Sequence, residues 1–439
     1  MKKDDVIVVG SGISGLLSAL ALSKEGKKVV ILEKDSYIGG VCRSYDVDGY
    51  RVDTGPHAIT RLESGPLKQL MDSYFSIVPQ FIPVGKYYVR IGGEIRPFPW
   101  SINAWLTFGL IPKTDRLLLM RALFNTMYLA NAGKDFSNIT LSEVLPAKIS
   151  NTTRRFLDFL CYFMVGTSIE HAPISRFVDN KTHNSRSIPY VGKIYDLFIS
   201  EGATDQGYPK GGLQSMIDAI LASFPKDSVQ IKTNEPVTKI ECDGRVKRVI
   251  TSEDSYDCET VVYSGSSSNL PHLIDGLPAE YVRNLNTIKK VNSLTIWLGL
   301  TQKHFTNYGT EFWVDANPYA WMVSTSNYDP SLAPKGNQLV GFAFTLPGDY
   351  SPAIRKTAYE TIVNNVPDIE KHIDMVHYQE LIPEKASWGI NCGFGDVRTP
   401  IKNLYCVGTD TTKRSAGVNR AAYSVLKLLD IIRSDGILK

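Results

Sequence analysis

The sequence predicts an α/β fold in which a Rossmann-like domain is interrupted by an inserted α+β domain. Three observations favour this fold. A short apolar strand, a glycine-rich turn, a helix and a second strand follow one another within the first 33 residues. Strand-like segments occupy residues 229–265, and a strand, a turn and a helix close the chain after residue 403. The segments between these three lack comparable motifs, so the inserted domain is expected there.

The composition is that of an ordinary globular protein. The chain has 439 residues, of which 43% are apolar, and this length suits roughly two or three domains. Its net charge of +3 gives no reason to expect a nucleic-acid partner, which usually requires a concentrated basic face. The 6 cysteines are scattered and form no CxxC pair. We therefore expect no metal site and no disulfide framework, and a reducing, cytoplasmic location.

The opening of the chain predicts a strand, a helix and a second strand. Residues 6–9 are apolar and mostly β-branched, which is typical of a buried parallel strand. Good helix formers follow over residues 16–24, and Gly26 stands where a helix C-cap is expected. Residues 28–32 form the next strand. The alternative is a secretory signal or membrane anchor, but Asp4 and Asp5 cancel the charges of the two lysines before them, and glycines and serines break the apolar run.

The turn of this unit has the spacing Gly10-x-Gly12-x-x-Gly15. Gly10 allows the sharp turn, Gly12 lets a pyrophosphate approach the backbone, and Gly15 lets the helix pack closely on the sheet. The helix N-terminus then offers free N–H groups to the phosphates. Glu33 ends the second strand and is placed to accept hydrogen bonds from ribose hydroxyls. This acid disfavours a 2′-phosphate, so FAD or NAD is predicted in preference to NADP.

The segment after Glu33 resembles the superfamily of FAD-dependent amine oxidases, phytoene desaturases and protoporphyrinogen oxidases. It carries a second glycine pair at Gly39 and Gly40, a basic residue at Arg43, and the run Asp53-Thr54-Gly55-Pro56-His57. The resemblance implies a Rossmann-like FAD-binding domain of the GR2 type. It also implies that Arg43 meets the pyrophosphate or ribityl chain, and that Gly55 and its neighbours pass the isoalloxazine ring. The alternative for the same residues is a glycine turn and a hairpin with a stray histidine.

The end of the chain carries the resemblance further. An apolar strand leads into Gly408-Thr409-Asp410, a variant of the more common Gly-Asp or Gly-Glu, and residues 421–432 predict a helix. The resemblance implies that Asp410 binds the ribityl or pyrophosphate region. It also implies that backbone N–H groups around Gly417, Val418 and Asn419 point at the N1 and O2 edge of the flavin, where a helix N-terminus favours reduction.

Two middle segments fit the same family. Residues 208–213 read YPKGGL, which resembles a segment beside the substrate side of the flavin, although a turn before a helix explains the glycines equally well. Residues 229–231, 235–240 and 245–250 alternate like a small antiparallel sheet, with Val237 beside the adenine. The predicted residues of a non-covalent FAD site are Gly10, Gly12, Ser14, Gly15, Glu33, Lys34, Gly39, Gly40, Arg43, Gly55, Pro56, His57, Val237, Gly408, Asp410, Gly417, Val418 and Asn419. The candidate catalytic residues are His57 and Lys210.

The domain boundaries follow from the positions of these motifs. We expect residues 1–80, 201–270 and 386–439 to form the FAD-binding domain, and residues 81–200 and 271–385 to form the substrate domain. The substrate segments are rich in aromatic residues, which suit an apolar pocket. Residues 100–130 predict a helical hairpin whose second helix is capped by Thr114. Such a hairpin is either buried or a peripheral contact with a membrane.

The function predicted from the sequence is that of an FAD-dependent oxidoreductase. The resemblance implies hydride transfer between flavin N5 and an apolar substrate of isoprenoid, carotenoid or porphyrinogen type, as a desaturase, oxidase or saturase. Three alternatives stay open: an amine oxidase, a non-redox flavin isomerase or UDP-sugar mutase, and a flavoprotein without catalysis. The sequence does not identify the electron acceptor or donor, or the oligomeric state.

Overall fold

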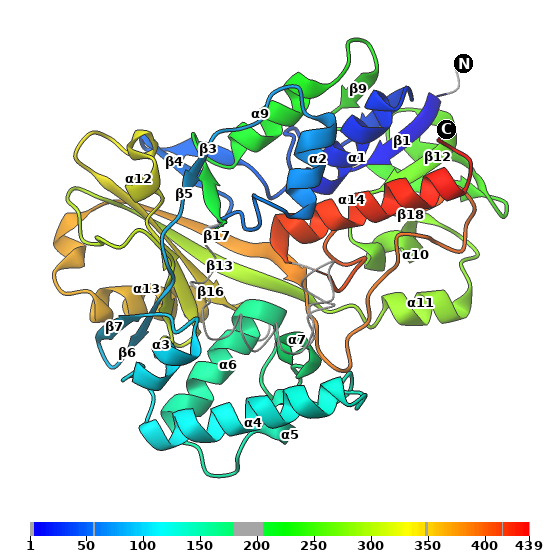
Figure 1. Cartoon of the computed structure of the whole chain (residues 1–439). Helices are drawn as coiled ribbons and strands as arrows, with labels where there is room; N and C mark the ends of the chain where they lie inside the picture. The colour runs from blue at the N-terminus through cyan, green and yellow to red at the C-terminus, as the bar shows by residue number, and fades with distance from the viewer. Residues whose placement is uncertain (1–3, 56–57, 179–204, 347–349, 415, 439) are drawn as a thin grey trace.

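The computed structural model describes residues 4–55, 58–178, 205–346, 350–414 and 416–438. Two seven-stranded sheets organise the chain, and helices cover both of them (Figure 1). The first sheet carries the N-terminal and C-terminal segments, and the second is built from the middle of the chain. The predicted α/β fold is confirmed.

The first sheet has a parallel centre in the order β18, β12, β1, β2 and β9. Its strands are short and apolar, and β1 and β2 are buried on both faces, as the opening of the sequence predicted. Their bounds are β1 (Asp4–Val9), β2 (Val29–Leu32), β9 (Val229–Lys232), β12 (Ser255–Tyr263) and β18 (Leu404–Cys406).

Helices close both faces of this sheet. On one face lie α1 (Ile13–Lys24), α2 (Pro66–Tyr74), α9 (Gln214–Ser223) and α14 (Gly417–Ser434), whose apolar residues share one core with β1 and β2 (Figure 1). On the other face lie the short helices α10 (Leu270–Leu273) and α11 (Ala279–Leu285). The chain therefore leaves the first sheet a second time only after α11, where β13 begins the return to the second sheet.

One detail of this region differs from the prediction. β10 (Val237–Cys242) and β11 (Val246–Thr251) form an antiparallel meander with the first half of β12, as expected. The segment at residues 229–231 does not join that meander. It forms β9, the parallel edge strand beside β2. An edge strand has solvent along one side and is only half-buried, and its alternation therefore resembles that of an antiparallel strand.

The second sheet is mixed and runs in the order β17, β13, β16, β15, β14, β6 and β7. Helix α13 (Pro352–Asn365) covers one face, and the other face meets the first domain and helix α6. The strands are β6 (Tyr88–Ile91), β7 (Glu94–Pro97), β13 (Lys290–Leu300), β14 (Glu311–Trp313), β15 (Ala320–Val323), β16 (Gln338–Thr345) and β17 (Ile373–Ala386).

Two small hairpin-like pairs join the sheets. The pair β3 (Ser44–Val47) and β4 (Tyr50–Asp53) is antiparallel, as is the pair β5 (Phe81–Pro83) and β8 (Gly207–Pro209). A short helix, α12 (Thr325–Tyr328), follows β15. Together these segments place the end of β4 against the second sheet.

A group of helices extends from the second sheet at the end of the molecule away from the first sheet (Figure 1). Its members are α3 (Ile102–Thr107), α4 (Lys113–Asn131), α5 (Leu141–Val144), α6 (Asn151–Val165) and α7 (Ser175–Val178). The predicted hairpin forms, but Thr114 does not cap α4, which begins one residue earlier with Pro112 at its N-cap. Within the described residues, no helix combines the length and apolarity needed to span a bilayer.

Candidate functional site

Glycines bring three backbone segments into close contact at the carboxyl end of β1. A Cβ at Gly15 would lie 2.1 Å from the carbonyl oxygen of Gly10, so α1 can approach the strand only with glycine at this position. A Cβ at Gly40 would lie 3.2 Å from the Cα of Gly12. The N–H of Gly39 donates to the Ser11 carbonyl oxygen at 3.0 Å. The two predicted glycine motifs therefore lie side by side.

The N-terminus of α1 opens into free space beside these glycines. Gly12 is the N-cap residue and provides no side-chain cap. A Cβ there would meet only the Ser264 Oγ, at 4.0 Å. The first N–H groups of the helix are thus available to an anion, and a side chain would fill the space that a pyrophosphate needs.

Glu33 lies at the end of β2 and is held from two sides. Its Oε2 accepts hydrogen bonds from the backbone N of Ser11 at 2.7 Å and from the Ser11 Oγ at 2.6 Å. Its Oε1 accepts from the backbone N of Asp35 at 2.9 Å. The carboxylate is therefore fixed beside the glycine turn. Lys34 is exposed and pairs with Asp35 at 2.7 Å, and this hydrogen bond raises the pKa of Lys34.

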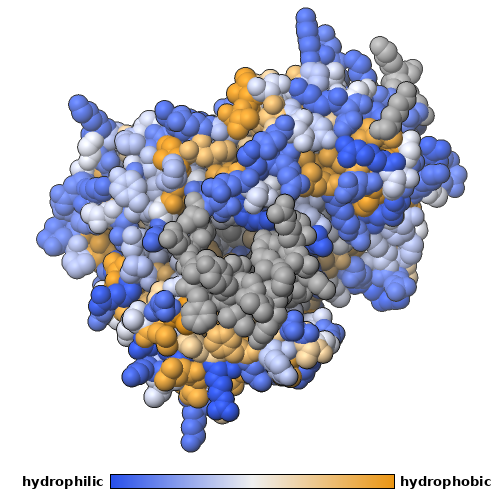
Figure 2. Space-filling view, in the orientation of Figure 1, coloured by the Kyte–Doolittle hydropathy of each residue, from blue (hydrophilic) through white to orange (hydrophobic). Residues whose placement is uncertain are grey.

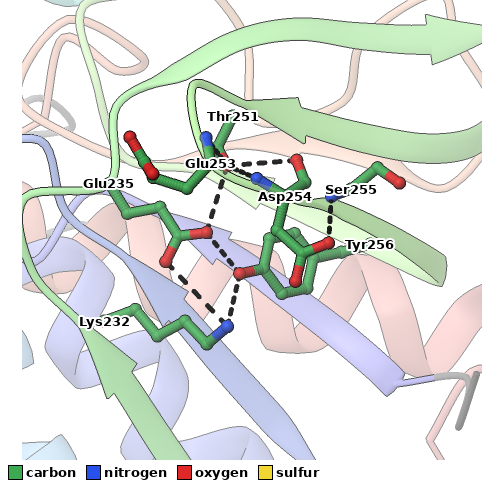
Figure 3. A network of polar contacts seen from close by, with 7 residues as sticks. All are labelled: Lys232, Glu235, Thr251, Glu253, Asp254, Ser255 and Tyr256. Carbon is green, nitrogen blue, oxygen red and sulfur yellow. Dashed lines mark hydrogen bonds and ion pairs between the residues drawn. The ribbon is translucent and has the colours of Figure 1, made fainter.

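A buried polar network supports the turn beside Glu33 (Figure 3). Tyr256 donates a hydrogen bond to the Glu235 carboxylate, and the Lys232 Nζ donates to the Tyr256 hydroxyl. The backbone N of Glu235 donates to the carbonyl oxygen of Glu33 at 2.8 Å. Val237, the residue predicted beside the adenine, follows two positions later in β10. The network thus anchors the segment from Glu235 to Val237 beside Glu33.

Tyr256→Phe is expected to weaken FAD binding about fivefold, because the network loses a hydrogen bond whose net contribution is about 1 kcal/mol. The measurement is the dissociation constant from flavin fluorescence during titration of the apoprotein. Asp257→Asn is the control, since it breaks a half-exposed ion pair with Arg248, 2.7 Å long, next to the network. Equal effects of both variants would contradict the assigned role.

The carboxyl ends of β12 and β18 complete the same edge of the sheet. Ser14 and Ser264 share a hydrogen bond of 2.8 Å between their hydroxyls. Asp410 is buried, and its Oδ2 accepts from the backbone N of Ser267 at 2.7 Å. Burial raises the pKa of Asp410. A Cβ at Gly408 would lie 3.9 Å from the Ser14 Oγ, so the Gly408–Asp410 turn lies beside the N-terminal motif.

Helix α14 begins at Gly417, four residues earlier than the helix that the sequence predicted, and its first N–H groups lack a side-chain cap. Among the described residues, no atom lies within 4 Å of a Cβ built at Gly417, so this helix end is also open. The Asn419 side chain donates to the Thr60 carbonyl oxygen and accepts from the backbone N of Leu67. It therefore ties α14 to the start of α2. Val418 lies between Gly417 and Asn419 and packs against the core of the first sheet.

Asp53, at the end of β4, is the centre of a second buried network. Its carboxylate accepts hydrogen bonds from Ser44 Oγ and Tyr208 Oη, each at 2.6 Å, and from the backbone N of Leu213 at 3.0 Å. Burial raises the pKa of Tyr208 well above its ordinary value, so this phenol stays protonated and donates. The predicted 208–213 segment is thereby fixed beside the end of β4.

Gln379 of β17 holds the backbone that follows Asp53. Its Oε1 accepts from the backbone N of Gly55 at 2.9 Å, and its Nε2 donates to the carbonyl oxygen of Asp53 at 2.8 Å. The Trp297 Nε1 of β13 donates to the same carbonyl at 3.0 Å. Two strands of the second sheet therefore position the segment that the resemblance places beside the isoalloxazine ring.

The remaining predicted residues fall in three places. The guanidinium of Arg43 lies 3.6 Å from the ring centroid of Tyr37, and within the described part of the chain it forms no ion pair. Lys210 follows β8, and its side chain is exposed. Pro56 and His57 lie outside the described residues. The catalytic roles of His57 and Lys210 stay predictions.

The donor set fits FAD. Two open helix N-termini suit the pyrophosphate and the flavin edge, and the cradle at Gly12 would be filled by any side chain. Sequence reasoning missed Ser264, Trp297 and Gln379. Ser264 could have been found, because it ends a strand parallel to β1 and such ends meet at one edge. The other two residues carry no local signal.

Comparisons with known proteins agree with this geometry. A family described as NAD(P)-binding Rossmann-like domain matches residues 8–74, and one described as flavin containing amine oxidoreductase matches residues 168–369. The 1-hydroxycarotenoid 3,4-desaturase of a Flavobacterium species is 24% identical over 398 residues, 80% of this chain and 78% of that protein. The all-trans-retinol 13,14-reductase of Homo sapiens is 44% identical over 66 residues, only 15% of this chain and 11% of that protein.

Solved structures show the same fold. An oxidoreductase from Methanosarcina mazei superposes with a TM-score of 0.79 at 18% identity, over 97% of this chain and 100% of that one. Wild-type putrescine oxidase superposes with a TM-score of 0.74 at 15% identity, over 98% and 99%. The chain therefore belongs to the superfamily of FAD-dependent, flavin-containing amine oxidoreductases, and it is an FAD-dependent oxidoreductase.

Proposed function

We propose that this protein transfers hydride between flavin N5 and a carbon of an apolar, isoprenoid-like substrate, as a desaturase or saturase. FAD, held without a covalent bond, supplies the hydride chemistry. The observation that carries the proposal is the aromatic face which the second sheet turns toward Asp53 and Gly55. A carotenoid desaturase that aligns with most of the chain supports the same substrate class.

The aromatic face is built from cross-strand neighbours. The indole of Trp297 lies over Gly341 on β16. A Cβ at Gly341 would lie only 2.7 Å from that indole, so glycine is needed there. Thr295, Ala343 and Trp321 form the adjacent row across β13, β16 and β15. Phe163 of α6 then packs edge-on against Trp321, with ring centroids 5.3 Å apart. Such a face buries apolar carbon and excludes water.

The residues of the chain act by binding and positioning. Gln379 and Trp297 fix the Asp53–Gly55 backbone, and Asp53 fixes the 208–213 segment through Tyr208. The aromatic face, with Trp297, Trp321 and Phe163, orients an apolar substrate against that backbone. Orientation of this kind accounts for a large part of the rate in reactions whose chemistry the cofactor supplies.

The deciding experiment starts with the visible spectrum of the purified protein and identification of the released flavin. If the enzyme is a desaturase, anaerobic titration of the oxidised protein with a more saturated, acyclic precursor of a polyene is expected to bleach the flavin bands. If the enzyme is a saturase, the flavin is first reduced with dithionite. A polyene is then expected to reoxidise the flavin and restore its visible bands. Putrescine and protoporphyrinogen serve as controls and are expected to leave the bands unchanged. Bleaching by the amine, or a protein that binds no FAD, would contradict the proposal.

We also propose that the α3–α4 hairpin contacts a membrane surface. Leu106, Leu117 and Tyr128 of this hairpin are 41%, 48% and 62% exposed. Figure 2 shows apolar side chains gathered at the lower end of the molecule, over α3 and α4. Lys113 and Arg121 are exposed on the same hairpin and suit anionic lipid headgroups. Beneath it lies an apolar cavity of about 250 Å³, whose lining includes Trp105 and Leu123.

Leu117→Glu is expected to reduce flotation of the protein with anionic phosphatidylserine vesicles about fivefold, because a charge replaces apolar surface at the interface. Ile77→Glu is the matched control, since Ile77 is 55% exposed but follows α2 in the first domain. Flotation that is absent in the wild type, or lost equally in both variants, would contradict the contact.

A further inference from the structure

Three hydrogen-bonded side chains lead from the edge strand of the second sheet to the Asp53–Gly55 backbone. Gln379, which holds this backbone, also donates from its Nε2 to the Tyr45 hydroxyl at 2.8 Å. The Tyr45 hydroxyl in turn lies 2.8 Å from the Nε2 of His377. Gln379 is buried, whereas Tyr45 and His377 are half-buried. We call Gln379, Tyr45 and His377 the side-chain triad.

Two strands place the members of this triad. His377 and Gln379 lie two residues apart in β17, so both side chains project from the same face. Tyr45 reaches them from β3, with its ring edge-on to the imidazole and the two ring centroids 5.6 Å apart. β4, the partner of β3, ends at Asp53, whose carbonyl oxygen accepts from Gln379. The β3–β4 hairpin is therefore bonded to β17 through both of its strands.

The backbone partners of Gln379 fix the orientation of its amide. Its Oε1 accepts from the N–H of Gly55, and its Nε2 donates to the carbonyl oxygen of Asp53. Rotation of the amide by half a turn would bring two donors together at Gly55 and two acceptors together at Asp53. The Nε2 carries two hydrogens, and the second one is directed at the Tyr45 oxygen. This oxygen is therefore an acceptor from Gln379.

The tautomer of His377 follows from the direction of these bonds. Because the Tyr45 oxygen accepts from Gln379, its own proton is donated to His377. The Nε2 of His377 can accept this proton only when the imidazole is neutral and carries its hydrogen on Nδ1. Burial lowers the pKa of His377, and the charge of Asp48 raises it to a smaller extent. The cross-strand neighbour on β13, Trp297, does not titrate. The imidazole is therefore neutral at neutral pH.

We propose that Tyr45 and neutral His377 are positioning residues, which hold the Gln379 amide and, through it, the Asp53–Gly55 backbone. This inference rests on the proposed function, because the substrate is oriented against that backbone.

Protonation of His377 reverses one bond of the triad, because its Nε2 then becomes a donor. The Tyr45 oxygen faces two donors in that state, and its own proton loses its acceptor. Gln379 is held less firmly as a result. Since the pKa of His377 is lowered, this change is expected below about pH 6.5, the ordinary pKa of histidine. Arg43, whose guanidinium lies 4.9 Å from the ring centroid of Tyr45, stays charged throughout.

The first test reads the tautomer without any substrate. The FAD-loaded protein, labelled with ¹⁵N-histidine, is observed by NMR at neutral pH, and the signal of His377 is the one that His377→Gln removes. The expected result is a hydrogen on Nδ1 and none on Nε2. A hydrogen on Nε2 would overturn the inference, since Tyr45 could then not donate to this nitrogen. Titration of the same signal gives the pKa of His377.

The second test reads how firmly the backbone is held. Hydrogen exchange of the Gly55 N–H in the FAD-loaded protein is measured by mass spectrometry and corrected for the intrinsic effect of pH. Tyr45→Phe, which keeps the ring and removes the hydroxyl, is expected to speed this exchange about fivefold, the effect of one lost hydrogen bond. In the wild type, a similar increase is expected as the pH falls, with its midpoint at the pKa of His377.

Two matched variants separate this role from general stability. Tyr50→Phe also removes a tyrosine hydroxyl of the β3–β4 hairpin that donates to β17, in this case to Asp374 at 2.9 Å. It is expected to leave the exchange of the Gly55 N–H unchanged. His377→Gln keeps an acceptor for the Tyr45 hydroxyl and cannot be protonated. Its exchange is expected to equal that of the wild type at neutral pH and to lose the dependence on pH.

Three exchange results would also overturn the inference. They are equal rates in the wild type and Tyr45→Phe, equal effects of Tyr45→Phe and Tyr50→Phe, and a dependence on pH that survives in His377→Gln. Neither the tautomer nor the exchange rate is read with substrate present. Failure of the proposed function is therefore a separate result, read from the flavin bands in the polyene titration.

Discussion

Gly15→Ala is expected to abolish tight FAD binding. The added Cβ would lie 2.1 Å from the carbonyl oxygen of Gly10 and 3.1 Å from the side chain of Ser264, so α1 must move away from the sheet. Overpacking of this kind costs about 3 kcal/mol of folding free energy. The displaced helix end no longer points its N–H groups at the pyrophosphate, and the dissociation constant is expected to rise about 100-fold or more.

The measurements are the FAD content of the purified variant, the dissociation constant from flavin fluorescence, and the urea midpoint. Gly109→Ala is the control, because no atom of the described part of the chain lies within 4 Å of a Cβ built there, and the φ of this loop glycine is not positive. It is expected to keep full FAD content. A Gly15→Ala protein that purifies yellow, with the dissociation constant of the wild type, would show that α1 does not bind the pyrophosphate.

The first domain could be predicted from the sequence because its information is local. The spacing of Gly10, Gly12 and Gly15 specifies a strand, a turn and a helix within a few residues, and the acid at Glu33 follows at the end of the next strand. The same holds for the turn at Gly408 and the helix at Gly417. Each of these motifs is defined by neighbours in the chain, so one sequence is enough to find it.

The second sheet could not be predicted in the same way. β16 is buried at all 8 positions and β13 at its last 8, so neither shows the alternation of apolar and polar residues that marks a strand. Both faces are covered, one by α13 and the other by the first domain and α6. A strand buried on both faces reads as an apolar run, and such a run does not reveal its partners.

In the candidate site, too, the residues in local motifs could be predicted, and their distant partners could not. Gly55 was predicted from its motif, but the residue that holds it, Gln379, lies 324 positions away. Ser14 was predicted, whereas its partner Ser264 is 250 positions away. A glutamine or serine has many roles, and only the three-dimensional arrangement brings Gln379 to the Asp53–Gly55 backbone and Ser264 to the turn before α1. The sequence therefore predicts the cofactor class and leaves out the residues that position it.

Gln379→Ala is expected to lower kcat roughly 10- to 100-fold, because a displacement of about 1 Å in a positioning segment has effects of this size. The variant removes the acceptor for the Gly55 N–H and one of the donors to the Asp53 carbonyl. The free energy of unfolding is expected to fall by about 2 kcal/mol, the cost of buried backbone groups that lose a partner. The visible flavin spectrum is expected to shift if the Asp53–Gly55 backbone borders the isoalloxazine ring, as the resemblance implies.

Gln338→Ala separates positioning from general stability. Gln338 is buried in β16, and its Oε1 accepts from the backbone N of Phe305 at 3.1 Å while its Nε2 donates to the Phe305 carbonyl at 2.7 Å. It thus ties a loop to the second sheet as Gln379 does, but away from Asp53. We expect a similar loss of stability, with kcat and the flavin spectrum unchanged.

Gln379→Glu tests which half of the amide matters. The variant keeps an acceptor for Gly55 and loses the donor to Asp53, whose carbonyl is still bound by Trp297. If holding the Gly55 N–H is the function of Gln379, this variant is expected to recover most of the kcat that Gln379→Ala loses. If Gln379→Ala and Gln338→Ala lower kcat equally, Gln379 acts only through stability. A third outcome is that Gln379→Ala lowers kcat, Gln338→Ala does not, and Gln379→Glu restores it. This outcome would show that one hydrogen bond from the second sheet, to the Gly55 N–H, positions the Asp53–Gly55 backbone.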